Sequence, residues 1–137
     1  MKNLYFLSNK LKFKFVALAL FSTVAILSCK DEEVNPYEDV TIQFKVESTT
    51  GVVLKSVVTQ VGVNQSQEFI LPSENYSTVP QIINTNVGAL HLASTAKGFD
   101  IDSELIVKIL VNGQIKATDT VSGSGNLTAK TQLSFIK

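Results

Sequence analysis

The sequence predicts an all-β domain built as a single antiparallel two-sheet sandwich. Apolar and polar residues alternate over residues 40–47 and again over residues 127–135, which is the period of a half-buried strand. Asn112-Gly113 separates two β-branched runs, the strongest short-range signal for a tight hairpin with a type I′ turn. About seven short strands, with turn residues at intervals of about ten, are typical of a sandwich.

The other strands are predicted where β-branched or apolar runs lie between turn residues. They are expected at residues 52–61, 67–71, 89–96, 105–111 and 114–121, and shorter, less regular segments lie at 76–79 and 81–85. The intervening turns include residues 48–51, 62–66, 97–100 and 122–126, which are rich in Gly, Ser and Asn. Pro72 and Pro80 bound the least regular segment, so a strand there is expected at a sheet edge. The architecture is immunoglobulin-like, without the paired cysteines and core tryptophan of antibody domains. The order of the strands is left open.

Composition limits the chain to one domain and excludes one class of partner. The 137 residues carry no formal net charge, but all twelve acidic residues lie after Cys29 and four of the twelve lysines lie before it. Residues 29–137 therefore carry eight lysines against twelve carboxylates, a net charge of −4. Because the sequence contains no arginine and this part is acidic, the basic surface that nucleic-acid binding uses is not expected.

The first 28 residues are predicted to be a lipoprotein signal peptide. Four lysines within the first fourteen residues form a positive n-region, and Phe15 to Leu27 is an apolar run broken only by Ser22 and Thr23. A helix that spans the hydrocarbon core takes about 20 apolar residues, so this run suits the h-region of a signal peptide better than a retained anchor. The chain then divides into a leader at residues 1–28, a tether at 29–39 and a sandwich at 40–137.

The end of the apolar run resembles the lipobox of bacterial lipoproteins. Ile26 is the aliphatic residue at −3, Ser28 the small residue at −1, and Cys29 the cysteine at +1. The resemblance implies cleavage between Ser28 and Cys29, a diacylglycerol on the Cys29 thiol and acylation of the new amino group by a fatty acid such as palmitate. Ordinary secretory cleavage is the alternative, but it requires a small residue where Ile26 stands. Several acyl chains together hold a protein firmly on a membrane.

The four residues after the cysteine resemble an export signal. Lys30-Asp31-Glu32-Glu33 is similar to the acidic run that sends lipoproteins of Bacteroidetes to the outer leaflet of the outer membrane. The resemblance implies an outer-membrane, surface-exposed protein. The alternative is that the acidic run is only a solvated tether, with the domain facing the periplasm.

Segments of the predicted domain are similar to the MmpS family. They are Val40-Thr41-Ile42-Gln43, Leu90-His91-Leu92-Ala93-Ser94, the hairpin from Leu105 to Lys116, Ala117-Thr118 and Leu127-Thr128-Ala129. Members of that family are small, membrane-anchored, exported β-sandwich proteins that accompany RND-type lipid transporters in mycobacteria. The resemblance implies a sandwich fold and an accessory, non-enzymatic role, and it supplies no catalytic residue. A lipid anchor departs from the transmembrane helix of the family.

No catalytic, metal or cofactor site is predicted. His91 is the only histidine, and it interrupts an apolar strand without a nucleophile motif nearby, so a structural histidine is favoured over a Ser-His-Asp hydrolase. Asp100, Asp102 and Glu104 alternate and offer hard oxygens to calcium. They are interpreted as a solvated acidic turn, because the segment lacks the glycine and the ligand set of a calcium loop.

Two further features bear on partners. Phe44 and Phe135 are assigned to the core, whereas Tyr76 and Phe99 are candidate contacts for a carbohydrate or adhesion ligand. Asp119-Thr120-Val121 resembles the site at which Bacteroidetes O-glycosylate exported proteins, and this makes Thr120 a candidate acceptor. An ordinary strand exit is the alternative.

The predicted function is that of a non-catalytic, lipid-anchored β-sandwich that binds or supports another component of the bacterial envelope. The alternatives are an accessory subunit of an RND-type transport complex and a carbohydrate or adhesion module.

Overall fold

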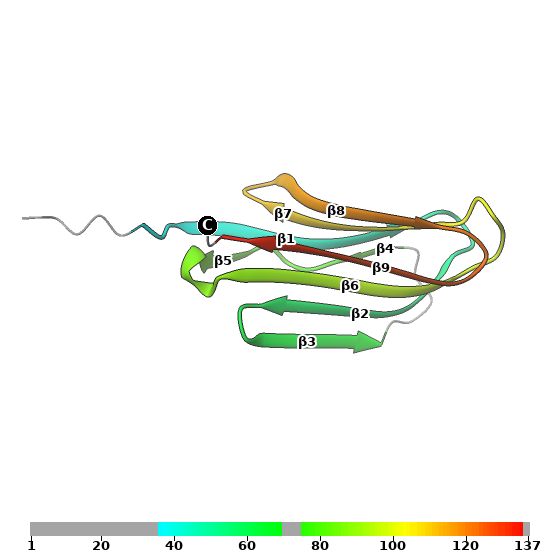
Figure 1. Ribbon diagram of the computed structural model, residues 1–137, viewed down its shortest axis with the longest axis horizontal. Helices are drawn as coiled ribbons and strands as arrows, with labels where there is room; N and C mark the ends of the chain where they lie inside the picture. The colour runs from blue at the N-terminus through cyan, green and yellow to red at the C-terminus, as the bar shows by residue number, and fades with distance from the viewer. Residues whose placement is uncertain (1–35, 70–74, 136–137) are drawn as a thin grey trace, which may run out of the picture. The chain divides into compact units, whose positions relative to one another are not determined.

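A computed structural model describes residues 36–69 and 75–135, which form two antiparallel sheets packed as a sandwich (Figure 1). Sheet A contains β1 (Asp39–Ser48), β4 (Asn75–Ser77), β5 (Gln81–Asn84), β7 (Glu104–Val111) and β8 (Gln114–Ser122). Sheet B contains β2 (Val53–Val61), β3 (Asn64–Phe69), β6 (Ala89–Gly98) and β9 (Gly125–Ser134). A 3-10 turn, η1 (Thr85–Val87), precedes β6.

The predicted antiparallel two-sheet sandwich is confirmed, with nine strands in the described residues where about seven were expected. The predicted leader, the cleavage at Ser28, the lipidation of Cys29 and the acidic run Lys30-Asp31-Glu32-Glu33 lie outside the described residues, and all of them stay predictions.

The strand order, which the sequence left open, is set by five changes of sheet along the nine described strands. In sheet A, β4 and β5 both pair with β1, and β7 and β8 follow; sheet B has the order β3-β2-β6-β9. The chain changes sheet after β1, β3, β5, β6 and β8, and the central pairs are β1 with β7 in sheet A and β2 with β6 in sheet B. In immunoglobulin domains the first two strands share a sheet. The sandwich therefore has immunoglobulin-like layers, with a strand order that differs from that of immunoglobulin domains.

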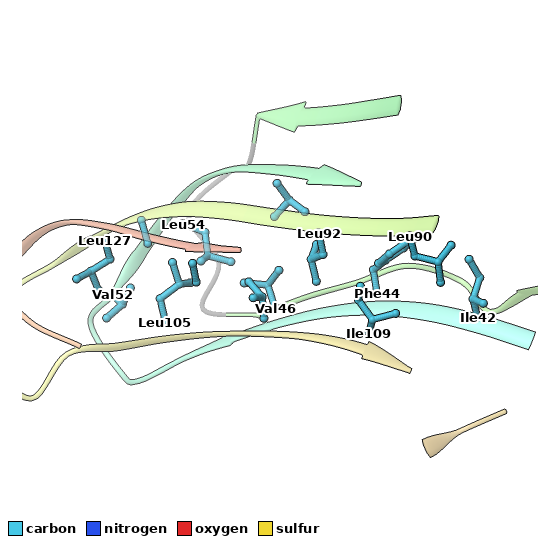
Figure 2. Packing of buried hydrophobic residues seen from close by; sticks show 14 of the residues in the cluster. Ile42, Phe44, Val46, Val52, Leu54, Leu90, Leu92, Leu105, Ile109 and Leu127 are labelled. Carbon is cyan, nitrogen blue, oxygen red and sulfur yellow. The ribbon is translucent and has the colours of Figure 1, made fainter. Parts of the chain in front are cut away.

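The core lies between the sheets and follows from the period of two. In β1, residues 40, 42, 44 and 46 are buried, while their neighbours are partly exposed. Ile42 and Phe44 have exposed fractions of 0% and 1%, and they pack with Leu90, Leu92 and Ile109 from the other central strands (Figure 2). Burial of each side chain of this size stabilises the folded state by about 1.5–3 kcal/mol. Phe44 was correctly assigned to the core, and Phe135 packs against it, partly buried.

The hairpin turns have the backbone angles that their sequences favour. Asn112 has φ 51° and Gly113 has φ 77°, so the predicted type I′ turn is confirmed. The side-chain Oδ1 of Asn112 also accepts a hydrogen bond from the Thr41 amide at 2.9 Å, which ties the turn to β1. The predicted turn over 62–66 was wrong, because Gly62, with φ 58°, turns the chain together with Val63 alone. Strand β3 consequently begins three residues earlier than the expected start at 67.

The corner between β6 and β7 is tightly packed around Gly98. The predicted turn over 97–100 was wrong, because β6 continues through Gly98 and the chain turns at 99–103. A Cβ on Gly98 would lie 2.3 Å from the carbonyl oxygen of Gly123 and 2.9 Å from the Cβ of Ser103. The Ser103 carbonyl in turn accepts the Gly123 amide at 2.9 Å. Only glycine therefore fits at position 98.

Candidate functional site

The two long sides of the sandwich differ. On one side β8 and β9 follow each other in the chain, and the Lys130 amide on β9 donates to Oδ2 of Asp119 on β8 at 3.0 Å. On the other side β3 of sheet B faces β4 and β5 of sheet A across a groove of about 540 Å³. The second side is the candidate site, because ligand pockets are typically concave and of about 300–1,000 Å³.

Sheet A contributes one wall of this open-edge groove through Tyr76 on β4 and Gln81 and Ile83 on β5. Each of the three pairs with a β1 residue whose side chain is buried in the core. Paired residues project to the same face of a sheet, so these three side chains point towards the space between the sheets.

Sheet B contributes the facing wall through Asn64, Ser66 and Glu68 on β3, with Thr59 and Val61 of β2 beside them. Glu68 pairs with the buried Val57, so its row of side chains also points inward.

The groove has two chemically different ends and a buried floor, Phe44. Ile83, Val61 and Val87 line the apolar end, beside η1. Tyr76 and Glu68 lie at the other end, where Tyr76 Oη donates to Glu68 Oε1 at 2.7 Å and so connects the two sheets. Amide and hydroxyl groups occupy the middle. The arrangement offers an apolar contact at one end, and hydrogen-bond donors and acceptors along the rest.

The proton affinity of the Tyr76 phenol departs clearly from its ordinary value. Burial raises the pKa of its phenol from 10.0 to about 12, and the hydrogen bond to Glu68 and the negative charge of that carboxylate add to the effect. The phenol therefore stays protonated and keeps donating at neutral pH.

His91 lies away from this groove, on the outer face of sheet B. It is partly buried, and its cross-strand neighbours are Gln60 on β2 and Gln132 on β9. Amides cannot supply the carboxylate or the nucleophile of a hydrolytic triad. Glu68 is the one carboxylate in the strands of sheet B, and it points into the groove on the other face. Within residues 36–69 and 75–135, the structure thus does not bring a triad together around His91.

The acidic turn is built by its own hydrogen bonds. Oδ1 of Asp100 accepts the Asp102 amide at 3.1 Å and the Ser103 hydroxyl at 2.9 Å. The Ser103 hydroxyl oxygen accepts the amides of Phe99 and Asp100 at 3.0 and 3.1 Å. Across residues 36–69 and 75–135, no three His, Cys, Asp or Glu residues are grouped so that they could hold a metal ion. In the same residues no helix is long and apolar enough to cross a membrane.

The remaining predicted positions fall at three separate places. Thr120 is exposed on β8, which leaves its hydroxyl accessible, and O-glycosylation there stays a prediction. Phe99, 66% exposed, lies in the corner at 99–103, away from the groove residues. Of the two predicted contact aromatics, only Tyr76 lines the groove.

Several groove residues were not found from the sequence. Glu68, Gln81 and Ile83 carry no motif, and their shared position depends on which strands become sheet edges. Part of the groove could be anticipated, because Glu68 falls in a predicted strand shortly before Pro72 and Tyr76 falls in the predicted edge segment that follows.

Comparison with known proteins gives no family assignment: no family model matches the chain, and no curated protein is similar to it.

Proposed function

We propose that this protein is a lipid-anchored, non-catalytic binding domain of the bacterial cell envelope, and that it holds another envelope component in the open-edge groove. The observation that carries the proposal is the groove itself. Two rows of inward-pointing side chains face each other there, over a floor formed by the buried Phe44. The sequence Ile26-Leu27-Ser28-Cys29 supports the anchor.

The lining suits an extended ligand that is partly apolar and partly polar. Because the two walls are rows of residues along β3 and along β4–β5, the groove runs parallel to the strands. Gln81 and Ser66 offer both donors and acceptors in its middle, and Ile83 offers an apolar contact at one end.

The apolar end also lies where the domain begins. Ile83 pairs with Val40 and Asn84 pairs with Asp39, the first residue of β1. The lipidated Cys29 would precede Asp39 by about ten residues, which span at most about 36 Å when fully extended. The tether thus keeps this end of the groove within reach of the membrane surface, where envelope components are held.

The anchor is tested by metabolic labelling with a palmitate analogue in cells that express the wild type or Cys29→Ala. We expect labelling of the wild type only. Protease treatment of intact cells then assigns the side of the membrane: digestion indicates the cell surface. Protection would place the domain in the periplasm, where the accessory role implied by the MmpS resemblance fits better. Labelling that survives Cys29→Ala would overturn the anchor.

The groove is tested with a photo-crosslinking amino acid at Gln81, which lines it, and at Thr128, which is exposed on β9. We expect a discrete crosslinked species from position 81 only. Ser66→Trp, which fills the groove from the opposite wall, should abolish it, and Thr128→Trp should not. Equal crosslinking from both positions, or crosslinking unaffected by Ser66→Trp, would rule out the groove as the binding site.

A further inference from the structure

Three of the four sheet edges carry features that prevent pairing with another chain. Proteins protect such edges with short strands, proline, lysine, irregular register or a covering segment. In sheet A, β4 and β5 have three and four residues with Pro80 between them, and β8 carries Lys116 and a register shift opposite β7. In sheet B, the Lys130 amide of β9 is taken by Asp119.

The fourth edge, β3, has none of these features in the described part of the chain. Its six residues, Asn64 to Phe69, are all exposed and contain neither lysine nor proline. Its pairing with β2 is regular over all six positions. Its one charged side chain, Glu68, points into the groove and accepts the Tyr76 hydroxyl.

The backbone groups that β3 offers can be assigned from the neighbouring hairpin. The Gly62 amide points away from β3, because it donates to the Ala89 carbonyl on β6 at 2.8 Å. Backbone groups alternate in direction along a strand, so Val61 faces β3 and bonds to its pair Asn64. Alternation along β3 then leaves the amides and carbonyls of Gln65, Gln67 and Phe69 on the free edge.

We propose that β3 pairs with β3 of a second copy of this chain, antiparallel and two-fold symmetric about Gln67. In this register Gln67 lies opposite the partner's Gln67, and Gln65 lies opposite the partner's Phe69. The two four-stranded sheets become one continuous sheet.

Three observations suit a second copy of the chain at this edge. The outward row of Gln65, Gln67 and Phe69 is uncharged, so self-pairing brings no like charges together, as a symmetric interface requires. The same pairing covers Phe69, whose exposed fraction is 79%, and satisfies the edge groups of both copies. On the proposed anchor, copies share one membrane surface, which raises their effective concentration. The pairing itself does not depend on the anchor.

The test is disulfide trapping of the full-length chain in its membrane. Paired Cα atoms are about 5.5 Å apart where antiparallel residues exchange hydrogen bonds, which lies within the range of a disulfide. After mild oxidation, Gln67→Cys should migrate as a dimer on a non-reducing gel. The matched control, Gln132→Cys, is an exposed glutamine on β9 of the same sheet and should stay monomeric. Wild type controls for disulfides through Cys29, the only native cysteine.

Two further variants test the register and the contact. Gln65→Cys alone should not form dimers, whereas co-expression with Phe69→Cys should link the two chains. In detergent, Gln67→Lys should abolish association of differently tagged copies because it opposes two positive charges, while Gln132→Lys should not. The proposal is overturned if the Gln67→Cys and Gln132→Cys variants crosslink equally. It is also overturned if Gln65→Cys links to itself as strongly as Gln67→Cys does, or if Gln67→Cys links only to a different protein. Association of the tagged copies that persists in Gln67→Lys would overturn the proposal as well.

Discussion

Removing the Tyr76 hydroxyl tests whether the open side of the sandwich is held by one hydrogen bond. The 2.7 Å bond from Tyr76 Oη to Glu68 connects β4 of sheet A to β3 of sheet B. A hydrogen bond to a charged group contributes about 1.5–3 kcal/mol. Because Glu68 is exposed and Tyr76 only half-buried, screening reduces this to about 1 kcal/mol. For a domain of this size, Tyr76→Phe should lower Tm by about 4–8 °C.

A double-mutant cycle with Glu68→Ala isolates the pair, because alanine leaves the Tyr76 hydroxyl without an acceptor at this position. We expect a coupling energy of about 0.5–1 kcal/mol, so the double variant should lose less stability than the two single variants together. The measurement is urea unfolding of the chain from residue 30 onward, followed by circular dichroism. Additive losses would show that the two side chains do not stabilise each other, and would refute the reasoning.

The pH dependence of stability is a second readout of the surroundings of Tyr76, whose phenol is affected first by burial and then by Glu68. The folded pKa of Tyr76, about 12, lies above the ordinary value of 10.0, so the folded state holds the phenolic proton more tightly than the unfolded state does. The stability from this group is complete below pH 10 and declines as the pH rises from about 10 to about 12. Tyr76→Phe should lack this decline. Identical pH profiles for wild type and Tyr76→Phe would contradict the raised pKa.

Three further substitutions test the fold. Gly98→Ala should lower the free energy of unfolding by about 2–4 kcal/mol, because the added Cβ overpacks the corner and disrupts the backbone hydrogen bond from Gly123 to Ser103. Thermal unfolding measures this, and Lys97→Ala, at an exposed neighbour on β6, should be nearly neutral. Asn112→Ala should cost about 1–2 kcal/mol, because it loses the bond to β1 and strains a positive φ, whereas Asn112→Gly should cost less. Asp119→Ala should speed hydrogen exchange of the Lys130 amide, whereas Asp119→Asn keeps an acceptor oxygen and should preserve its protection.

The parts of the fold that were predicted correctly are those encoded locally. Alternation over residues 40–47 places the same four side chains of β1 in the core, and Asn112-Gly113 has the two positive φ angles that its turn requires. Each of these signals lies within about eight consecutive residues, so no long-range contact was needed to recognise it.

The parts that were missed depend on contacts between distant segments. Gly98 was assigned to a turn because glycine is common there. The structure uses it within a strand, because the Gly123 carbonyl approaches too closely for any Cβ. Asp119 was noted only for a three-residue glycosylation pattern, yet its carboxylate accepts an amide eleven positions away on β9. Nothing in either local sequence indicates these partners.

The errors of the sequence interpretation concentrate in the segment that builds the groove. The start of β3 was misplaced, and the strand expected at 76–79 is shorter and ends at Ser77. These strands are short or wholly exposed, so few buried apolar side chains mark them in the sequence. A sandwich with longer, more apolar strands here would close this side as β8 and β9 close the other. The short, exposed strands therefore explain both the weak sequence signals and the open edge. Such losses of local consistency are expected at functional sites.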